Sequence, residues 1–187
     1  MLQTLLFFHV LAVAGLFVGL SIEIAALVRV HRAQTLSDAR AALLNVPIVG
    51  PVMGMSVLLL LAMGISMIYV GGFGWTAAWI NIVFGLTIVL AIIGPAVSGR
   101  RVDALHALAA SAGEGPITPE VDAGRRDRLL NYMVFLSLFE VIAALYIMIT
   151  KPELAPAITV VVAAAVFAGV PAALLLRRTS TPAVERT

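Results

Sequence analysis

Residues 2–28 read LQTLLFFHVLAVAGLFVGLSIEIAALV, an apolar stretch long enough to cross a bilayer as a single helix. At 100° per residue, Glu23 lies about 40° around this helix from His9 and roughly 21 Å further along it. Gly15 and Gly19 follow on the same side. One flank of the helix therefore carries an imidazole, two bare backbone patches and a carboxylate.

This flank has two interpretations. Glycines four residues apart allow a neighbouring helix to approach closely, and the polar groups could hydrogen-bond across that contact. Alternatively, an ionisable side chain in a membrane helix marks a proton, ion or ligand site, because its burial must be offset by some interaction. Residues 2–28 alone leave both interpretations open.

The composition is that of a polytopic membrane protein. Of the 187 residues, 61% are hydrophobic and only 12% are charged, whereas a soluble domain is about half apolar and a quarter charged. Several apolar runs approach the roughly 20 residues that span a bilayer. The spans should be helices, because backbone polar groups must be satisfied internally in lipid. The absence of cysteine excludes disulfides, thiolate metal sites and cysteine nucleophiles.

The chain reads as one all-α domain over residues 1–176, followed by a tail that should be disordered, residues 177–187. The expected spans cover approximately residues 2–28, 46–70, 75–97, 129–150 and 155–176. Ala12-Val13-Ala14 resembles a signal-peptide cleavage site, but no Lys or Arg precedes it and the apolar run continues beyond it. We therefore expect no cleavage there. In the second span, Gly50 and Gly54 repeat the close-packing spacing.

The connectors contain helix signals of their own. Thr35 followed by Asp38 resembles a capping box and predicts a helix over residues 36–44. In the long polar segment, Val102 and Leu105 fall on one helical face, which predicts a helix lying on the membrane surface. Thr118 and the proline after it predict another helix start. We expect that helix to run on into the fourth span.

Basic residues predict the orientation. Of the 12 Lys and Arg residues, 11 fall in the connector after the first span, the long connector or the C-terminal tail, and only Lys151 lies on the opposite side. The positive-inside rule then places the N-terminus outside and the C-terminus in the cytoplasm, with five spans between. We expect a multi-pass protein of the bacterial inner membrane whose main partner is the lipid bilayer. No basic stripe with interleaved aromatics suggests nucleic acid.

Glu140 is the strongest functional candidate. It lies near the centre of the fourth span, one turn after Ser137, at a depth where an unpaired carboxylate costs a few kcal/mol. It could carry protons, bind a cation or act as an acid or base, or it could hydrogen-bond to a neighbouring helix. Glu23 lies nearer the membrane surface, where it can reach water or an arginine. Asn81 is more typical of a hydrogen bond between helices than of a ligand.

His9 could ligate haem or a metal or relay protons, although a lone histidine is more often a packing residue. His31, after the first span, should be solvated. Three histidines without ligand spacing are a weak metal signal. We find no nucleophile–base pair, phosphate loop or nucleotide fingerprint, so the sequence favours a protein that is not an enzyme.

Short motifs resemble a known family. They are the opening LFFHVLAVAG, the proline-bearing start of the second span, Gly74-Trp75, Gly94-Pro95 and Ile149-Thr150-Lys151-Pro152. Together they resemble an uncharacterised bacterial family of small predicted integral membrane proteins that carries a domain of unknown function. The resemblance covers about residues 1–153.

The layout is also distantly similar to the HemJ-type protoporphyrinogen oxidase and to copper-resistance D membrane proteins. The similarity to the HemJ type rests on His9, His31, the Arg128-Leu-Leu-Asn131 stretch and the Lys151-Pro152 pair. It implies haem ligation and porphyrinogen oxidation. The HemJ type also carries a lysine and a histidine in its third span, however, and this sequence has neither.

Three functions are therefore compared. The leading hypothesis is proton-coupled handling of a small ligand or ion through Glu140, with Glu23 and His9 secondary. The second is a haem-binding redox protein that uses His9. The third is a structural or assembly subunit, or a homo-oligomer, whose small-residue faces such as Gly15 and Gly19 dock partner helices.

Overall fold

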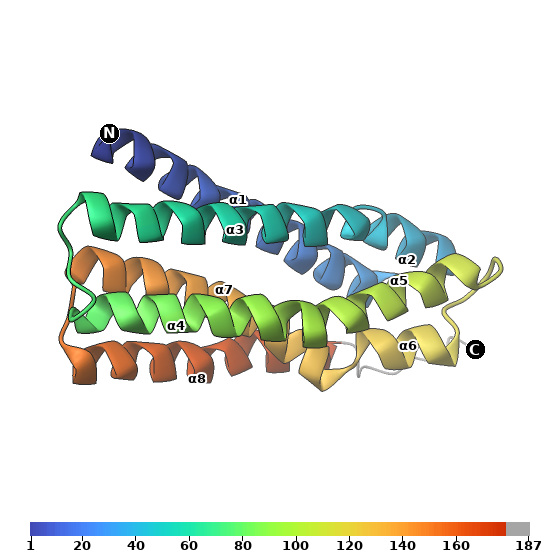
Figure 1. Cartoon of the computed structure of the whole chain (residues 1–187). Coiled ribbons are helices and arrows are strands. Elements are labelled where there is room, and N and C mark those ends of the chain that lie inside the picture. Colours follow the sequence, from blue (N-terminus) through green and yellow to red (C-terminus); the bar gives the residue numbers. More distant parts are fainter. Residues whose placement is uncertain (179–187) are drawn as a thin grey trace.

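The computed structural model describes residues 1–178, and this part of the chain consists of helices without a β-strand (Figure 1). Its elements are α1 (Leu2–Arg32), α2 (Leu36–Leu43), α3 (Val46–Val70), α4 (Ala78–Ile93), the π-helix η1 (Gly94–Gly99), α5 (Arg100–Ser111), α6 (Pro119–Arg125), α7 (Arg128–Thr150) and α8 (Leu154–Arg178). Five helical segments are long and apolar enough to cross a membrane, as predicted. The predicted disordered tail lies outside the described residues except for its first two positions, which end α8.

The spans form a bundle in which α1 packs mainly against α3, and α7 mainly against α8, while α4 lies against α7. The N-terminus, the α3–α4 turn and the α7–α8 turn share one end of the bundle (Figure 1). At the opposite end, α2, α5 and α6 gather around the adjoining ends of α1 and α7. We call this second part the head.

The head has a hydrophobic core of its own. Leu27, Leu43, Leu105, Val121 and Leu130 each come from a different helix and are almost fully buried together. The structure therefore differs from the expectation that the apolar face of residues 98–112 would rest on the membrane. That face instead packs against the chain's own helices, because they extend beyond the apolar spans and present an apolar surface to it.

α5 is a continuation of α4 through η1 rather than a separate helix. Pro95 has no backbone N–H to give to an α-helical bond. At the end of η1, the backbone N–H of Arg100 donates to the carbonyl of Pro95, five residues back, which is the spacing of a π-helix. The Ser98 hydroxyl donates to the Gly94 carbonyl at 2.9 Å. Residues 78–111 therefore form one rod that leads from the spans into the head (Figure 1).

Two of the predicted helix starts are confirmed. The Thr35 hydroxyl accepts from the Asp38 backbone N–H at 3.1 Å, and the Asp38 carboxylate accepts from the Thr35 N–H at 3.2 Å, which completes the capping box of α2. At the start of α6, the Thr118 hydroxyl accepts from the Val121 backbone N–H at 3.4 Å. The expected run into the fourth span is wrong, because α6 ends at Arg125 and α7 begins separately, with Asp127 accepting two backbone N–H bonds at its start.

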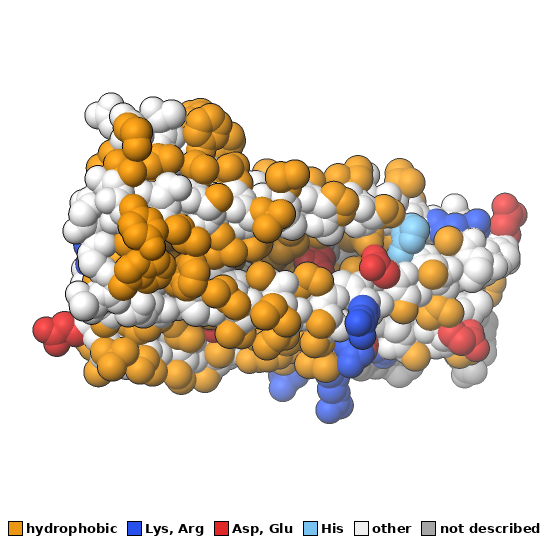
Figure 2. All heavy atoms as spheres, viewed as in Figure 1, with side chains coloured by type: hydrophobic (Ala, Val, Ile, Leu, Met, Phe, Trp, Pro, Cys, Tyr) orange, Lys and Arg blue, Asp and Glu red, His pale blue; other side chains and the backbone are white. Residues whose placement is uncertain are grey.

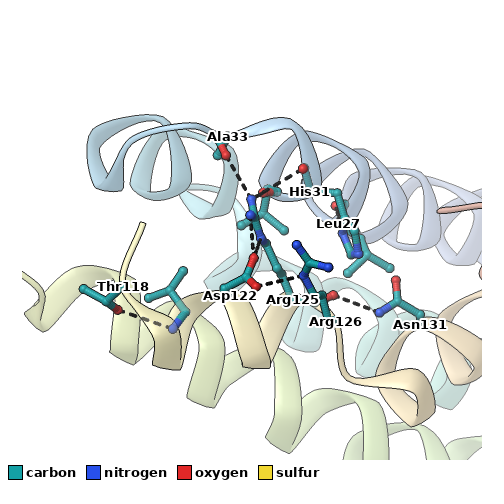
Figure 3. A network of polar contacts seen from close by, with 10 residues as sticks. Leu27, His31, Ala33, Thr118, Asp122, Arg125, Arg126 and Asn131 are labelled. Carbon is teal, nitrogen blue, oxygen red and sulfur yellow. Dashed lines mark hydrogen bonds and ion pairs between the residues drawn. The ribbon is translucent and has the colours of Figure 1, made fainter. Parts of the chain in front are cut away.

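Arg125 links α6 to the C-terminal end of α1 (Figure 3). Its Nη1 donates to the carbonyls of Val30 at 3.0 Å and Ala33 at 2.9 Å, so it satisfies the C-terminal end of α1 across 90 residues of sequence. Its other nitrogens bond to Asp122 at 2.6 and 2.8 Å. His31 was expected to be solvated but is only 6% exposed, and its Nδ1 donates to the Leu27 carbonyl at 2.9 Å. It is buried because α6 and α7 cover the end of α1.

The surface of the spans is apolar over most of its area, while charged side chains gather toward the head (Figure 2). The spans containing α3 and α4 are the least buried, and the one containing α7 is the most buried. Large side chains such as Met55, Leu58, Val89 and Ile92 are exposed on α3 and α4. A surface of this kind is stable against lipid acyl chains, so the protein is embedded in a bilayer.

Candidate functional site

A cavity of about 740 Å³ lies between α1, α3, α7 and the rod formed by α4, η1 and α5. Its volume falls within the roughly 300–1,000 Å³ typical of small-molecule sites. Figure 2 looks onto the side where α3 and α4 lie and shows a hollow between them with an acidic side chain inside it and another beside it at the surface. Most of the wall is made of Leu, Val, Ala and Met side chains.

The cavity brings together four of the residues singled out from the sequence. His9 and Glu23 reach it from α1, and Ser137 and Glu140 reach it from α7. Because His9 and Glu23 lie roughly 21 Å apart along α1, the cavity extends through much of the bundle. Three polar residues that the sequence analysis did not single out also line it: Thr87, Ser98 and Asp103.

Glu140 is buried in the wall of the cavity. Its side chain is 3% exposed, and Oε2 is buried without a hydrogen-bond partner. The neighbouring Ser137 hydroxyl donates to the carbonyl of Met133 on its own helix, at 3.0 Å. Its proton is therefore already engaged, and Ser137 does not neutralise the buried carboxyl. A buried, unpartnered carboxyl in a cavity wall is available to a ligand or a proton.

His9 is 6% exposed and rests in a notch on α3. A Cβ built on Gly64 would lie 3.5 Å from Cε1 and 3.7 Å from Nδ1 of the ring, at van der Waals distance, so the imidazole packs against α3 at this glycine. The backbone of Leu60 lies close to the ring, but neither ring nitrogen has a partner of hydrogen-bonding geometry. Gly64 was missed because nothing in the sequence shows which helix His9 faces.

Glu23 and Asp103 mark the head end of the cavity. Glu23 is 5% exposed, whereas Asp103 lies exposed at the rim. The two carboxylates are near enough for their charges to interact. Among the side chains of residues 1–177 neither has an ion-pair partner. Asp103 could not be placed from helical periodicity, because the π turn of η1 shifts the phase of every side chain that follows it.

The two glycine pairs lie in different surroundings. A Cβ on Gly15 or Gly19 would clash with Ser56 or Met53 of α3, so these glycines allow α1 and α3 to pack closely. No heavy atom lies within 4 Å of a Cβ built on Gly50 or Gly54. Both line the cavity, and their lack of side chains widens it.

Asn81 lies away from the cavity, at the N-terminal end of the bundle. It is exposed, and its Nδ2 donates to the Trp75 carbonyl at 2.7 Å, which holds the α3–α4 turn. Lys151 braces the same end, because its ammonium lies 5.5 Å from the ring centre of Phe73 and 5.6 Å from that of Trp79. These contacts join the α3–α4 turn to the α7–α8 turn.

Comparison with known proteins gives one match. The family model described as "Predicted integral membrane protein (DUF2269)" matches residues 3–152. The chain belongs to this family. No curated protein and no solved structure matches the chain. The matched residues include every residue that lines the cavity, whereas α8 lies beyond them.

Haem, which the similarity to the HemJ type implies, fits this cavity poorly. His9 could provide one axial nitrogen, but neither His31 nor His106 lines the cavity. The two propionates of haem are anionic and are best placed beside cations. The described part of the wall has no Lys or Arg, and it has three carboxylates instead. Among residues 1–178 no group of three His, Cys, Asp or Glu residues is arranged to hold a metal ion.

Proposed function

We propose that this member of the family binds a small ligand or ion inside its membrane bundle and couples that binding to protons. Glu140 is the principal residue, and Glu23 and His9 are secondary. The observation that carries the proposal is the unpartnered Oε2 of Glu140 in the wall of a 740 Å³ cavity. Burial of such a group is costly, and a proton or a bound ligand offsets that cost.

We further propose that the head lies in the cytoplasm and that the protein is located in the bacterial inner membrane. In support of this orientation, 11 of the 12 Lys and Arg residues belong to segments at the head end or to the C-terminal tail. The positive-inside rule then places the N-terminus outside. Glu23 and Asp103 would accordingly lie at the cytoplasmic end of the cavity.

Proton flux into reconstituted vesicles tests the function. The purified full chain is placed in liposomes that contain a pH-sensitive dye, and a pH gradient is imposed. We expect Glu140→Gln to abolish the protein-dependent flux, because an amide cannot take up a proton. Glu114→Gln is the matched control, since Glu114 is exposed in the loop between α5 and α6. Equal flux in the wild type and Glu140→Gln would overturn the proposal.

An assembly subunit is less well supported, because the chain itself uses several of its small-residue faces. Gly15 and Gly19 pack against α3. On α8, Ala168 is fully buried beside Phe135 of α7, and the Ala165 carbonyl accepts a bond from the Tyr132 hydroxyl at 3.1 Å. These faces are therefore not free to dock helices of a partner or of a second copy.

A further inference from the structure

The negative charge of the cavity wall indicates the class of ligand that it binds. This inference rests on the proposed function. Three carboxylates from three helices line the cavity, namely Glu23, Asp103 and Glu140, while the described part of its wall contains no Lys or Arg. Among the described side chains, those of residues 1–177, none of the three has an ion-pair partner. A ligand that brings a positive charge would offset the repulsion between Glu23 and Asp103 and the burial of Glu23 and Glu140.

Two acids of the head, Asp122 and Asp127, form ion pairs. In the head, Asp122 contacts Arg125 at 2.6 Å and Arg126 at 2.8 Å, and Asp127 contacts Arg101 at 3.4 Å. These two carboxylates therefore have arginine partners within the fold. The cavity acids lack such partners, which leaves their charge available to something that enters the cavity.

The wall also restricts the kind of cation. A bare metal ion needs several oxygen or nitrogen ligands arranged around one point, and no group of three His, Cys, Asp or Glu residues in the described chain provides that. Most of the wall is aliphatic, so it favours a ligand with an apolar body. An organic cation satisfies both the carboxylates and the aliphatic wall.

The opening of the cavity indicates the route of access. Gly50 and Gly54 leave the α3 side of the wall open, and the hollow lies between α3 and α4 (Figures 1 and 2). Exposed Met55 on α3 and Ile92 on α4 belong to the lipid-facing surface of these spans. A ligand can therefore reach the carboxylates from the bilayer, where apolar cations accumulate.

We propose that the cavity binds an apolar organic cation, which enters between α3 and α4 and pairs its positive charge with Glu140. Its apolar body lies along the aliphatic side chains of α3 and α4. Glu23 and Asp103 add negative potential at the head end. Because a proton and the cation compete for the same carboxylate, binding strengthens as the pH rises and releases a proton when Glu140 is protonated beforehand.

Two ions of nearly equal size and opposite charge test the proposal. Radiolabelled tetraphenylphosphonium, a permanent cation, and tetraphenylborate, the corresponding anion, are equilibrated with the full chain in lipid nanodiscs, with empty nanodiscs as the background. We expect saturable binding of the cation and at least about tenfold weaker binding of the anion. Glu140→Gln should weaken cation binding by about tenfold or more, Glu140→Asp should restore part of it, and Glu114→Gln should leave it unchanged.

The outcomes separate the two proposals. Equal binding of both ions, no saturable binding of the cation, or cation binding that is unchanged in Glu140→Gln would overturn the ligand class. If proton flux nevertheless depends on Glu140, the proposed function is retained and only the assignment of an organic cation as the ligand is rejected. If the wild-type protein shows neither protein-dependent proton flux nor saturable cation binding, both proposals are overturned. Elution of Glu140→Gln at the wild-type position in size-exclusion chromatography excludes misfolding as the cause of weaker binding.

Discussion

Arg125 in the head and Glu140 in the cavity are buried ionisable side chains with opposite surroundings. In the head, the Arg125 side chain donates to three carbonyls of α1 and pairs with Asp122. In the cavity, Glu140 is less exposed than Arg125, yet its Oε2 has no partner. The same chain thus satisfies one buried ionisable group completely and leaves another unsatisfied. Arg125 therefore has a structural role, whereas the unpartnered carboxyl of Glu140 lines a cavity and is available to a ligand.

The largest effect on stability should follow from Arg125→Ala. The substitution leaves three carbonyls at the C-terminal end of α1 without their partner, at a cost of about 3 kcal/mol or more, while Asp122 keeps its ion pair with Arg126. We expect the midpoint of thermal unfolding, followed by tryptophan fluorescence in detergent, to fall by several degrees. Arg100→Ala is the control, because Arg100 is exposed. Equal midpoints for the two variants would show that the head does not depend on this network.

The glycine pairs provide the next test. Gly15→Leu would force its side chain into Ser56, and overpacking of this kind costs about 1–3 kcal/mol. Gly54→Leu places the same side chain in open space at the cavity, so stability should change little while tetraphenylphosphonium binding weakens. Thermal unfolding and binding are measured for both variants. A Gly15→Leu protein more stable than the wild type would contradict the close contact of Gly15 with α3. Unchanged tetraphenylphosphonium binding in Gly54→Leu would contradict the position of Gly54 in the cavity wall.

Glu140→Gln should change stability in the direction opposite to Arg125→Ala. An amide is less costly to bury than a carboxyl that must ionise in order to work, so we expect a gain of up to about 1 kcal/mol. Proton flux should be lost in the same variant. Chemical or thermal unfolding in the same detergent gives the comparison. A large loss of stability would mean that Glu140 is a structural residue like Arg125.

The smallest effect should come from the capping box of the head. Thr35→Ala removes the hydroxyl that accepts from the Asp38 N–H, and losses of this kind are about 1 kcal/mol. Thr35→Ser keeps the hydroxyl and should unfold like the wild type. Ligand binding should be unaffected in both variants, which would confirm that the head and the cavity are energetically separate at this position.

Much of the fold could be predicted because its signals are local. Each span is a continuous apolar run, and the start of α2 depends on two residues three positions apart, Thr35 and Asp38. The common flank of His9 and Glu23 follows from the period of one helix, and both residues line the cavity. These properties depend only on neighbours along the chain.

The remaining features depend on contacts between distant segments or on a break in periodicity. Arg125 caps a helix that ends more than 90 residues earlier, which no pattern around it shows. Gly50 and Gly15 occur in the same spacing, yet only the neighbouring helices decide that one faces open space and the other faces α3. Asp103 lies beyond a π turn, so a constant 100° per residue misplaces it.

The rod formed by α4, η1 and α5 has a mechanical consequence. It is roughly 50 Å long, and it lines the cavity with one part while Leu105 and Ala109 anchor another part in the core of the head. Such a rod acts as a lever with its weak point at η1. A tilt of about 5° there moves the far end of α5, roughly 18 Å away, by about 1.5 Å. A molecule that pushes α4 outward would therefore disturb the packing of Leu105 and Ala109 in the head.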